Sequence, residues 1–280
     1  MTERLEALKV WPQHLLPQRA LTALAWRLST CRAGWFKNAF IRLFIRLFGV
    51  DLNEAEKDQP RDYPCFNAFF TRALKPGARP DPPAASALIS PCDGAISQLG
   101  RISSGRLIQA KDRDFLVGEL LGDPALADDF ANHRFITIYL APRDYHRVHM
   151  PMAGRLIEEV RIPGRLFSVS AATARHIPRL FARNERLAAI FDGQHGRFAV
   201  VMVAAMLVAG IETVWGGPDD RRPGPAIRRR QPAGVDLERG AEMGRFHWGS
   251  TVIVLAPPAL PDWQSGLSPE QRVQLFQPLA

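Results

Sequence analysis

The chain has 280 residues, of which 46% are hydrophobic and 23% are charged. This composition is that of an ordinary globular protein with a sizeable core, and it excludes a disordered chain. No uninterrupted apolar run approaches the roughly 20 residues that a transmembrane helix needs. The N-terminus lacks the basic segment, apolar stretch and small-residue cleavage site of a secretory signal, so we expect no such signal.

The formal net charge of +8 is concentrated near the N-terminus, where residues 1–48 carry most of the excess of Lys and Arg over Glu. The rest of the chain is close to neutral. A nucleic-acid-binding protein is therefore not expected, because such proteins carry extended basic surfaces. Cys31, Cys65 and Cys92 form no C-x-x-C pair, so neither a zinc site nor a disulfide framework is predicted, and a reducing compartment is the simplest fit.

Two helices are predicted near the N-terminus, over residues 17–32 and 35–48. The second has apolar side chains around most of its circumference and a narrow cationic stripe. Such a helix suits the plane of an anionic bilayer, and packing on the protein's own core or on a partner is an equal alternative from the pattern alone. The side chains predicted to contact a membrane are Phe36, Phe40, Arg42, Leu43, Phe44, Arg46 and Leu47.

The chain divides into an N-terminal helical region with its connector, residues 1–60, and a body, residues 61–280. Helical pattern in the body is confined to residues 171–181 and to short pieces, and short β-type runs dominate from residue 88 onward. The predicted fold class is α+β, a compact β-rich catalytic body with an N-terminal amphipathic helical membrane-binding attachment. Strands are predicted over residues 94–99, 107–110, 135–140, 154–162, 198–203, 208–214 and 251–255.

Three polar stretches of the body carry the groups of a nucleophile relay. Asp93 lies in a turn before one strand, His146 and His149 follow another, and Ser250 opens a third directly behind Gly249. In such a relay the imidazole takes the hydroxyl proton and the carboxylate orients the imidazole. The structural alternatives are a turn-capping Asp, ordinary surface or core histidines and a Gly-Ser turn. A histidine pair on a helical turn could bind a metal, but no third ligand with recognisable spacing follows, so no metal is predicted.

A serine hydrolase is the first competing interpretation of Ser250. Its nucleophile elbow requires the pattern G-x-S-x-G, whereas Trp248 and Val252 stand two residues on either side of Ser250. Gly249 is instead bonded directly to Ser250. This order favours attack by the Ser250 hydroxyl on the carbonyl of the preceding peptide bond.

The segment over residues 240–253, GAEMGRFHWGSTVI, resembles the processing segment of bacterial phosphatidylserine decarboxylase proenzymes. Further blocks that resemble this family follow one another in the same order, so the resemblance covers most of residues 66–255. These blocks lie at residues 66–72, 90–100, 139–151, 166–169, 180–186 and 210–215. The family usually has Leu-Gly-Ser-Thr at the cleavage site, whereas this chain has Trp248 in the leucine position.

The resemblance implies a proenzyme that cuts itself between Gly249 and Ser250. In this course His149, oriented by Asp93, removes the proton from Ser250 Oγ, which attacks the Gly249 carbonyl to give an ester. Elimination yields dehydroalanine, which becomes an imine and is hydrolysed to a pyruvoyl group with loss of ammonia. The cofactor is therefore expected to be a pyruvoyl group formed covalently from Ser250, with no metal.

The resemblance also implies the reaction, which is conversion of phosphatidylserine to phosphatidylethanolamine with release of CO₂ in phospholipid biosynthesis. The substrate amine forms a Schiff base with the pyruvoyl group, which accepts the electron pair left by CO₂. His146 is predicted to return a proton to the α-carbon. Chains 1–249 and 250–280 are expected to form a heterodimer, within a further homo-oligomer, on the cytoplasmic face of the cell membrane as a peripheral protein.

Two other functions stay open at this point. One is an Asp-His-Ser hydrolase that acts on lipid or peptide at the membrane surface, which predicts an intact chain that reacts with fluorophosphonates. The other is a non-catalytic peripheral membrane module, which predicts neither cleavage nor a reactive carbonyl group.

Overall fold

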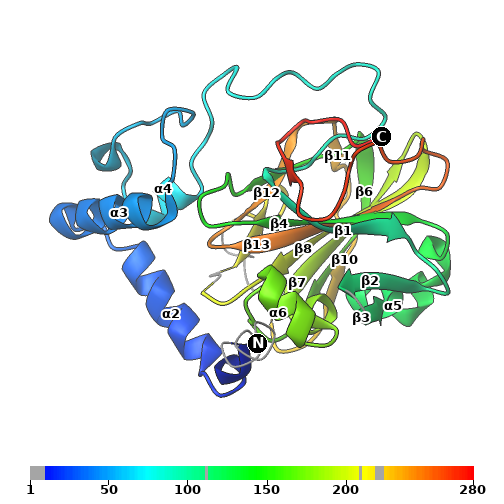
Figure 1. Cartoon of the computed structure of the whole chain (residues 1–280), viewed down its shortest axis with the longest axis horizontal. Coiled ribbons are helices and arrows are strands. Elements are labelled where there is room, and N and C mark those ends of the chain that lie inside the picture. The colour runs from blue at the N-terminus through cyan, green and yellow to red at the C-terminus, as the bar shows by residue number, and fades with distance from the viewer. Residues whose placement is uncertain (1–9, 111–112, 208–209, 218–223) are drawn as a thin grey trace.

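Figure 1 shows the computed structural model, which describes residues 10–110, 113–207, 210–217 and 224–280. A pair of N-terminal helices lies to one side of a body that is formed mainly by β-strands. The helices are η1 (Trp11–His14), α2 (Gln18–Ser29), α3 (Gly34–Phe48), η2 (Pro60–Asp62), α4 (Phe66–Phe70), α5 (Val117–Leu121), η3 (Pro124–Leu126), η4 (Asp128–Phe130), α6 (Ala171–His176) and α7 (Leu180–Arg183).

The body contains one large antiparallel sheet and two small ones. The large sheet comprises β1 (Gly94–Arg101), β4 (Arg134–Leu140), β6 (Gly154–Ile162), β7 (Arg186–Gly193), β8 (Gly196–Ala204), β10 (Arg228–Arg230), β11 (Asp236–Leu237), β13 (Ser250–Ala256) and β14 (Arg272–Val273). Its order is β10-β6-β7-β8-β13-β4-β1-β14, and β11 also pairs with β6. The small sheets are β5 (Arg147–His149), β12 (Glu242–Phe246) and β9 (Ile211–Thr213), and β2 (Arg106–Ala110) with β3 (Arg113–Leu116).

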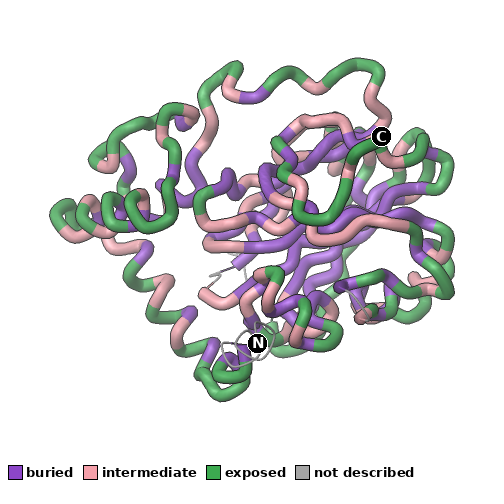
Figure 2. The backbone as a smooth tube through the Cα atoms, viewed as in Figure 1, coloured by how far each residue is buried: buried purple, intermediate pink, exposed green. Residues whose placement is uncertain are grey.

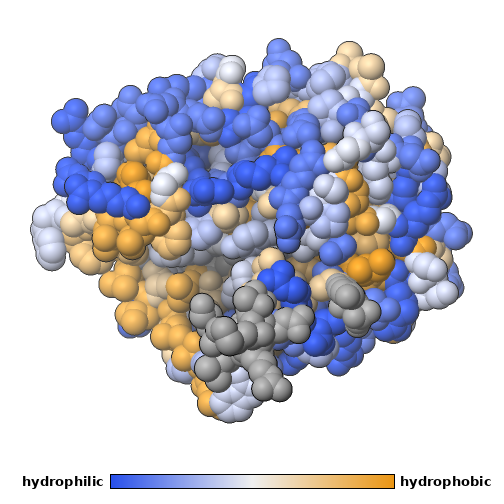
Figure 3. All heavy atoms as spheres, in the orientation of Figure 1, coloured by the Kyte–Doolittle hydropathy of each residue, from blue (hydrophilic) through white to orange (hydrophobic). Residues whose placement is uncertain are grey.

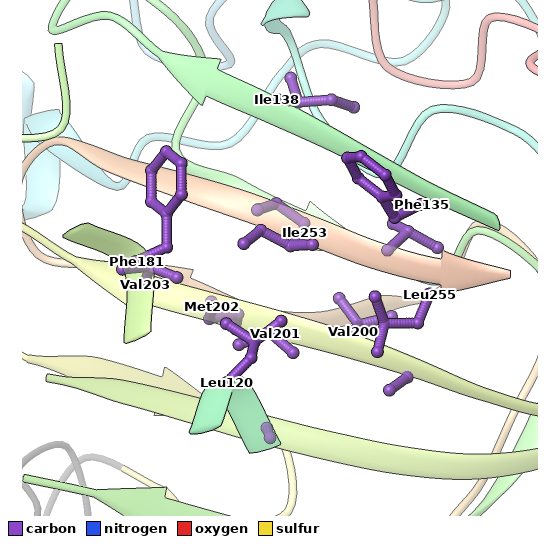
Figure 4. Packing of buried hydrophobic residues seen from close by; sticks show 14 of the residues in the cluster. Leu120, Phe135, Ile138, Phe181, Val200, Val201, Met202, Val203, Ile253 and Leu255 are labelled. Carbon is purple, nitrogen blue, oxygen red and sulfur yellow. The ribbon is translucent and has the colours of Figure 1, made fainter. Parts of the chain in front are cut away.

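Strand β13 lies in the middle of the large sheet, between β4 and β8. All seven of its residues are buried. Its unbroken run of β-branched and aliphatic side chains suits a strand that is covered on both faces. Figure 4 shows Ile253 and Leu255 of β13 among the buried side chains of β4 and β8. This packing fixes the first residue of β13, Ser250, within the body.

The three-stranded sheet leads the chain into the large one. Strand β12 pairs with β5 along one edge and with β9 along the other, and Glu242 lies opposite His149. Residues 247–249 then connect β12 to β13. The chain therefore passes from the small sheet to the large sheet just before Ser250.

Helix α2 buries polar side chains and exposes apolar ones, which is the reverse of the usual arrangement. Its buried residues are Gln18, Thr22 and Ser29, whereas Leu24 and Leu28 are exposed. Figure 2 shows the exposed outer side of the N-terminal helices. A helix of a soluble protein normally buries its leucines, so this arrangement leaves an apolar surface that the chain itself does not cover.

Hydrogen bonds from polar side chains attach the N-terminal helices to the body. Gln18 Oε1 accepts a hydrogen bond from the backbone N–H of Leu166 at 2.9 Å. In α3, Lys37 Nζ donates to the carbonyl oxygens of Pro60 and Arg61, each at 3.3 Å. These polar contacts explain how the helices can dock while part of their apolar surface faces outward.

Helix α3 also contributes to an aromatic cluster within the protein. Phe44, which the sequence pattern predicts at a membrane, is only 4% exposed and packs against Phe66, Phe69 and Phe70 of α4. Phe40 is half-buried and stacks on Phe66. These two rings therefore serve the protein's own core, because α4 lies against the side of α3 that carries them.

The predicted fold class is confirmed, since the structure is a β-rich body with N-terminal helices. The predicted strands correspond to β1, β2, β4, β6, β8 and β13, with small differences at their ends. The strand predicted over residues 208–214 is shorter and forms β9, and residues 208 and 209 lie outside the described residues. The division of the chain between residues 60 and 61 stays a prediction.

Two parts of the sequence-based interpretation differ from the structure. The helix predicted over residues 171–181 is divided into α6 and α7, because Pro178 cannot continue a helix and Arg179 adopts a left-handed φ of +52°. The helical turn considered for the histidine pair is instead the entry into strand β5. Among the described residues, no helix combines the length and the hydrophobicity that crossing a bilayer would require.

Gly94, at the start of β1, provides a test of the packing beside the candidate site. A Cβ atom at this position would lie 2.5 Å from the carbonyl oxygen of Tyr139 and 2.7 Å from Ile138 Cγ2. We expect Gly94→Ala to lower the free energy of unfolding by about 1–3 kcal/mol in urea titrations, because β4 cannot move away without disturbing the sheet. Gly100→Ala on the same strand is the control, since its Cβ would meet Phe135 at an ordinary 3.4 Å. Equal stability of the two variants would contradict this account.

Candidate functional site

Asp93 lies in the turn before β1, with its carboxylate buried. Its Oδ1 accepts hydrogen bonds from Arg79 Nε at 3.1 Å and from the backbone N–H of Leu275 at 2.8 Å. Arg79 Nη2 also bonds Asp93 Oδ2 and, at 2.8 Å, Glu54. The Arg79 guanidinium therefore compensates the buried negative charge of Asp93.

Ser250 lies beside the end of β4, close to the position of Asp93. The register pairs Ser250 with Leu140 of β4 on one side and with Ala204 of β8 on the other. Strand β1 approaches β4 from the opposite edge, with Ala95 opposite Tyr139. Asp93, two residues before Ala95, and Ser250 thus flank the same end of β4 on its two sides.

The hydroxyl of Ser250 is fully buried and has no hydrogen-bond partner among the described residues. Buried hydroxyl groups are normally bonded, so an unpaired one marks a position with a function other than stability. Directly before it, Gly249 has no atom within 4 Å of the position that a Cβ would take. The space beside the Cα atom of Gly249, next to the peptide bond that precedes Ser250, is therefore open.

Trp248 adopts a left-handed backbone conformation, with φ at +116°. This conformation is strained for a residue with a large side chain and persists only where the surroundings hold it. The indole stacks on Phe66 with ring centroids 4.8 Å apart and on Phe70 at 5.5 Å. The aromatic cluster around α4 thus fixes the backbone immediately before the Gly249–Ser250 bond.

His146 is completely buried and stacks on Phe70, with ring centroids 4.1 Å apart. Neither of its ring nitrogens has a hydrogen-bond partner of good geometry among the described residues. Burial, followed by the positive charge of Arg72, lowers the pKa of His146 to about 3. The ring is therefore neutral at pH 7, which differs from the near-neutral pKa assumed for a proton donor.

A continuous stack of five rings connects helix α3 to His146. Phe40 stacks on Phe66 at 4.4 Å, Phe66 stacks on Trp248, Trp248 stacks on Phe70, and Phe70 stacks on His146. The rings come from α3, α4, the connection before β13 and the loop before β5. This stack joins the N-terminal helices to the candidate site.

His149 lies on β5 with both ring nitrogens occupied. Its Nδ1 lies 2.7 Å from the carbonyl oxygen of Gly240, and its Nε2 lies 3.0 Å from the hydroxyl of Tyr145. Since a carbonyl can only accept, Nδ1 carries the hydrogen and Nε2 accepts from Tyr145. Burial lowers the pKa of His149, so the neutral form with a basic Nε2 is favoured.

The structure thus brings the sequence-predicted residues to one region without the hydrogen bonds of a complete relay. Asp93 is bonded to Arg79 and Leu275, and His149 is oriented by Gly240 rather than by Asp93. Asp93 still acts on His149 through its charge. The roles predicted for Asp93, His149, His146 and Ser250 stay predictions.

Several contacting residues were not identified from the sequence. Arg79 lies in a proline-rich segment without periodicity, and Tyr145 has no pattern of its own. His247, two residues before Gly249, bonds Glu212 at 2.9 Å and the side chain of Asn67. The described residues contain no group of three His, Cys, Asp or Glu side chains that could hold a metal ion.

Comparison with known proteins identifies the family to which this site belongs. A family model described as phosphatidylserine decarboxylase matches residues 66–280, and a second model, described as PSD, matches residues 8–49. A phosphatidylserine decarboxylase proenzyme of Xanthomonas campestris is 52% identical over 269 residues, which cover 95% of each chain. The chain belongs to the phosphatidylserine decarboxylase family.

Other relatives with this name agree. The proenzyme of Pseudomonas fluorescens is 52% identical over 272 residues, which cover 95% of this chain and 94% of the relative. That of Azotobacter vinelandii is 50% identical over 270 residues, with the same coverage. The family assigned from the sequence is confirmed, and with it the prediction that the chain is an enzyme, a decarboxylase.

The burial of neutral His146 predicts a loss of stability in acid. The pKa of about 3 in the folded protein is below the 6.5 of a free histidine, so the unfolded chain takes up the proton first. Stability is therefore lost as the pH falls from about 6.5 towards 3, and His146 alone should account for about 2 kcal/mol between pH 7 and pH 5. Urea titrations at both pH values measure this difference.

The matched variants are His146→Leu and His195→Gln, both made in Ser250→Ala so that every chain stays in one piece. His195 is exposed on the turn between β7 and β8. We expect the pH-dependent loss to shrink in His146→Leu and to persist in His195→Gln. The same loss in both variants would exclude His146 as its source.

Proposed function

We propose that this chain is a self-processing, pyruvoyl-dependent phosphatidylserine decarboxylase that acts at a membrane surface. The observation that carries the proposal is Ser250, whose unpartnered, buried hydroxyl directly follows Gly249 at the first position of a central strand. Membership of the family and the word proenzyme in the names of its relatives support it. The product is phosphatidylethanolamine, and the pathway is phospholipid biosynthesis.

The first step of the proposed reaction is cleavage of the Gly249–Ser250 bond. His149 Nε2 takes the proton from Ser250 Oγ after exchanging its bond to Tyr145 for one to Ser250. The oxygen attacks the Gly249 carbonyl, and the acyl group moves from nitrogen to oxygen, so that an ester replaces the amide. Asp93, held by Arg79, stabilises the imidazolium that forms on His149.

The ester is then eliminated, and hydrolysis of the resulting imine releases ammonia and leaves a pyruvoyl group at position 250. The carbonyl of the pyruvoyl group would supply an electron sink for the electron pair that remains when CO₂ leaves the serine headgroup of the substrate. The surroundings of Ser250 fit such a group, because the strand holds it rigidly and the site is shielded from water. We propose His146 as the residue that returns a proton to the substrate.

Cleavage would leave a heterodimer of chains 1–249 and 250–280. The shorter chain contains β13, which is paired with β4 and β8 along almost its whole length, and β14, which is paired with β1. These ladders and the buried side chains of β13 support a stable complex without a covalent link. A further homo-oligomer remains part of the proposal.

The apolar outer surface of the N-terminal helices supports association with the cytoplasmic face of the cell membrane. In α3, Leu43 and Leu47 are 53% and 69% exposed, and Arg42 and Arg46 are exposed beside them. Figure 3 shows hydrophobic side chains gathered over the N-terminal helices. Exposed leucines with flanking arginines suit insertion below the phosphates of an anionic bilayer.

Single substitutions test the cleavage step. We expect the wild type to run as two fragments on a denaturing gel, with a smaller fragment that is blocked at its N-terminus and reacts with an amine and cyanoborohydride. Ser250→Ala and His149→Ala should stay uncut, because each removes a group that the attack needs. His146→Ala should be cut and should decarboxylate at least about 100-fold more slowly, since it lacks the proton donor.

Three results would overturn this scheme. Cutting at the normal rate in His149→Ala would remove His149 as the base. An uncut wild type that reacts with a fluorophosphonate would point instead to a hydrolase, and an uncut, unreactive wild type to a membrane module without catalysis.

Cosedimentation with vesicles tests the membrane surface. We expect the double variant Leu43→Asp, Leu47→Asp to reduce binding to phosphatidylserine-containing vesicles by at least about tenfold. The reason is that charged groups replace the apolar side chains that would insert into the bilayer. Ile108→Asp is the control, since Ile108 is 51% exposed on β2, away from the helices. Undiminished binding of the double variant would exclude this surface of α3.

A further inference from the structure

Arg72 is a buried arginine whose hydrogen-bonding capacity is only partly used. It lies two residues after the end of α4 and is 5% exposed. Its Nη2 donates to the carbonyl oxygens of Arg143 at 3.0 Å and Asp144 at 3.4 Å. Its Nε and Nη1 are buried and have no hydrogen-bond partner among the described residues.

The carboxylates nearest to Arg72 are already engaged by other groups. Asp144 accepts from the backbone N–H of Ala141 at 2.7 Å and from Arg272 at 2.6 Å. Asp93 is bonded to Arg79. These acids act on Arg72 only through space, while burial lowers the pKa of Arg72. A buried guanidinium with free N–H groups is costly, so its retention indicates a partner that arrives from outside the chain.

The unpartnered N–H groups of Arg72 lie in the same region of the protein as the Gly249–Ser250 bond. Its guanidinium lies 5.6 Å from the ring centroid of Phe69, and its charge acts on His146. Arg72, His146, Trp248 and Ser250 all carry buried polar atoms without partners. In a folded protein such atoms are rare, and their concentration here indicates the place where a polar ligand binds.

We propose that Arg72 binds the phosphodiester group of the lipid substrate through one of its free N–H groups, on Nε or Nη1. A hydrogen bond from a guanidinium to a phosphate oxygen is charge-assisted, and the negative charge of the phosphate compensates the buried cation. This inference rests on the proposed function, because it takes the substrate to be phosphatidylserine. It adds a substrate-binding residue to the predicted set.

The substrate carries a second anion, the serine carboxylate, and the chemistry favours the phosphate as the partner of Arg72. The carboxylate loses its charge when CO₂ leaves, so a tight ion pair to it would stabilise the ground state and slow the reaction. The phosphate keeps its charge from substrate to product. An arginine that binds the phosphate therefore positions the headgroup without opposing decarboxylation.

A bound phosphate would also change the neighbourhood of His146. Arg72 is the charged side chain that disfavours protonation of the His146 ring, and the carbonyl groups of Ala141 and Pro142 favour it. A phosphate on Arg72 would offset the positive charge. Substrate binding would thereby favour the protonated form of His146 at the step in which the substrate takes up a proton.

The test compares Arg72→Met and Arg72→Lys with Arg143→Met, which removes an exposed cation from the loop before β5. The ligands are dihexanoyl phosphatidylethanolamine, which has the phosphate but no carboxylate, and dihexanoyl phosphatidylserine. We expect Arg72→Met to weaken the affinity for phosphatidylethanolamine by about 10- to 100-fold and to raise the KM for phosphatidylserine similarly. Arg72→Lys should lie between, and Arg143→Met should match the wild type.

Affinity for phosphatidylethanolamine that is unchanged in both Arg72 variants would overturn the inference, and a raised KM for phosphatidylserine alone would assign Arg72 to the carboxylate instead. Denaturing gels of the same samples report cleavage separately. An uncut wild type would remove the proposed function, while the phosphatidylethanolamine affinity would still decide the role of Arg72. If Arg72→Met does not fold, Arg72→Lys decides, since it keeps the charge but replaces the planar guanidinium and its fixed N–H directions by an ammonium group.

Discussion

The two hydrogen-bonded ladders on β13 are the constraint on which the site depends. They hold Ser250 between Leu140 and Ala204, and the buried side chains behind it prevent the strand from shifting along its neighbours. On the other side of Ser250, the ring stack holds Trp248 in a left-handed conformation. The Gly249–Ser250 bond therefore lies between two rigid parts of the protein, which is the kind of positioning that makes an intramolecular attack fast.

Several of the buried polar groups that lack a hydrogen-bond partner among the described residues gather around the candidate site. Other buried polar side chains are fully used: Asn184 bonds three backbone groups, and Arg186 donates to three carbonyl oxygens. Around β13 the protein leaves Arg72 Nε and Nη1, both ring nitrogens of His146 and the Ser250 hydroxyl without hydrogen-bond partners among the described residues. A fold retains such groups at a cost in stability where function requires them.

How far the sequence predicted this structure depends on the range of the interactions involved. Apolar runs such as residues 198–203 and 251–255 predicted strands, because burial on both faces leaves a local pattern. The short strands β5 and β12 were missed, since three to five polar and apolar residues carry too weak a period. The eight-residue strand β7, whose first six residues are buried, was also missed. The residues around β5 and β12 were assigned to the candidate site by their resemblance to a known family and not by periodicity.

The candidate site shows the same limit. Ser250, Asp93 and the two histidines could be chosen from residue type and motif, but the pairing of Asp93 with Arg79 depends on how a proline-rich segment folds back. The direction of Phe44 was also set by tertiary packing, because a helix with apolar side chains on most of its surface does not reveal which side faces the protein.

The central strand of the large sheet, β13, follows both of its neighbours, β4 and β8, in the chain. Strands β4 and β8 have no neighbour between them until residues 250–256 have emerged from the ribosome. A polypeptide that ends before β13 can form neither the ladders that hold Ser250 nor the complete sheet that shields it from water. The order of translation thus delays any chemistry at Ser250 until β13 has been made and has joined β4 and β8, without a dedicated inhibitor.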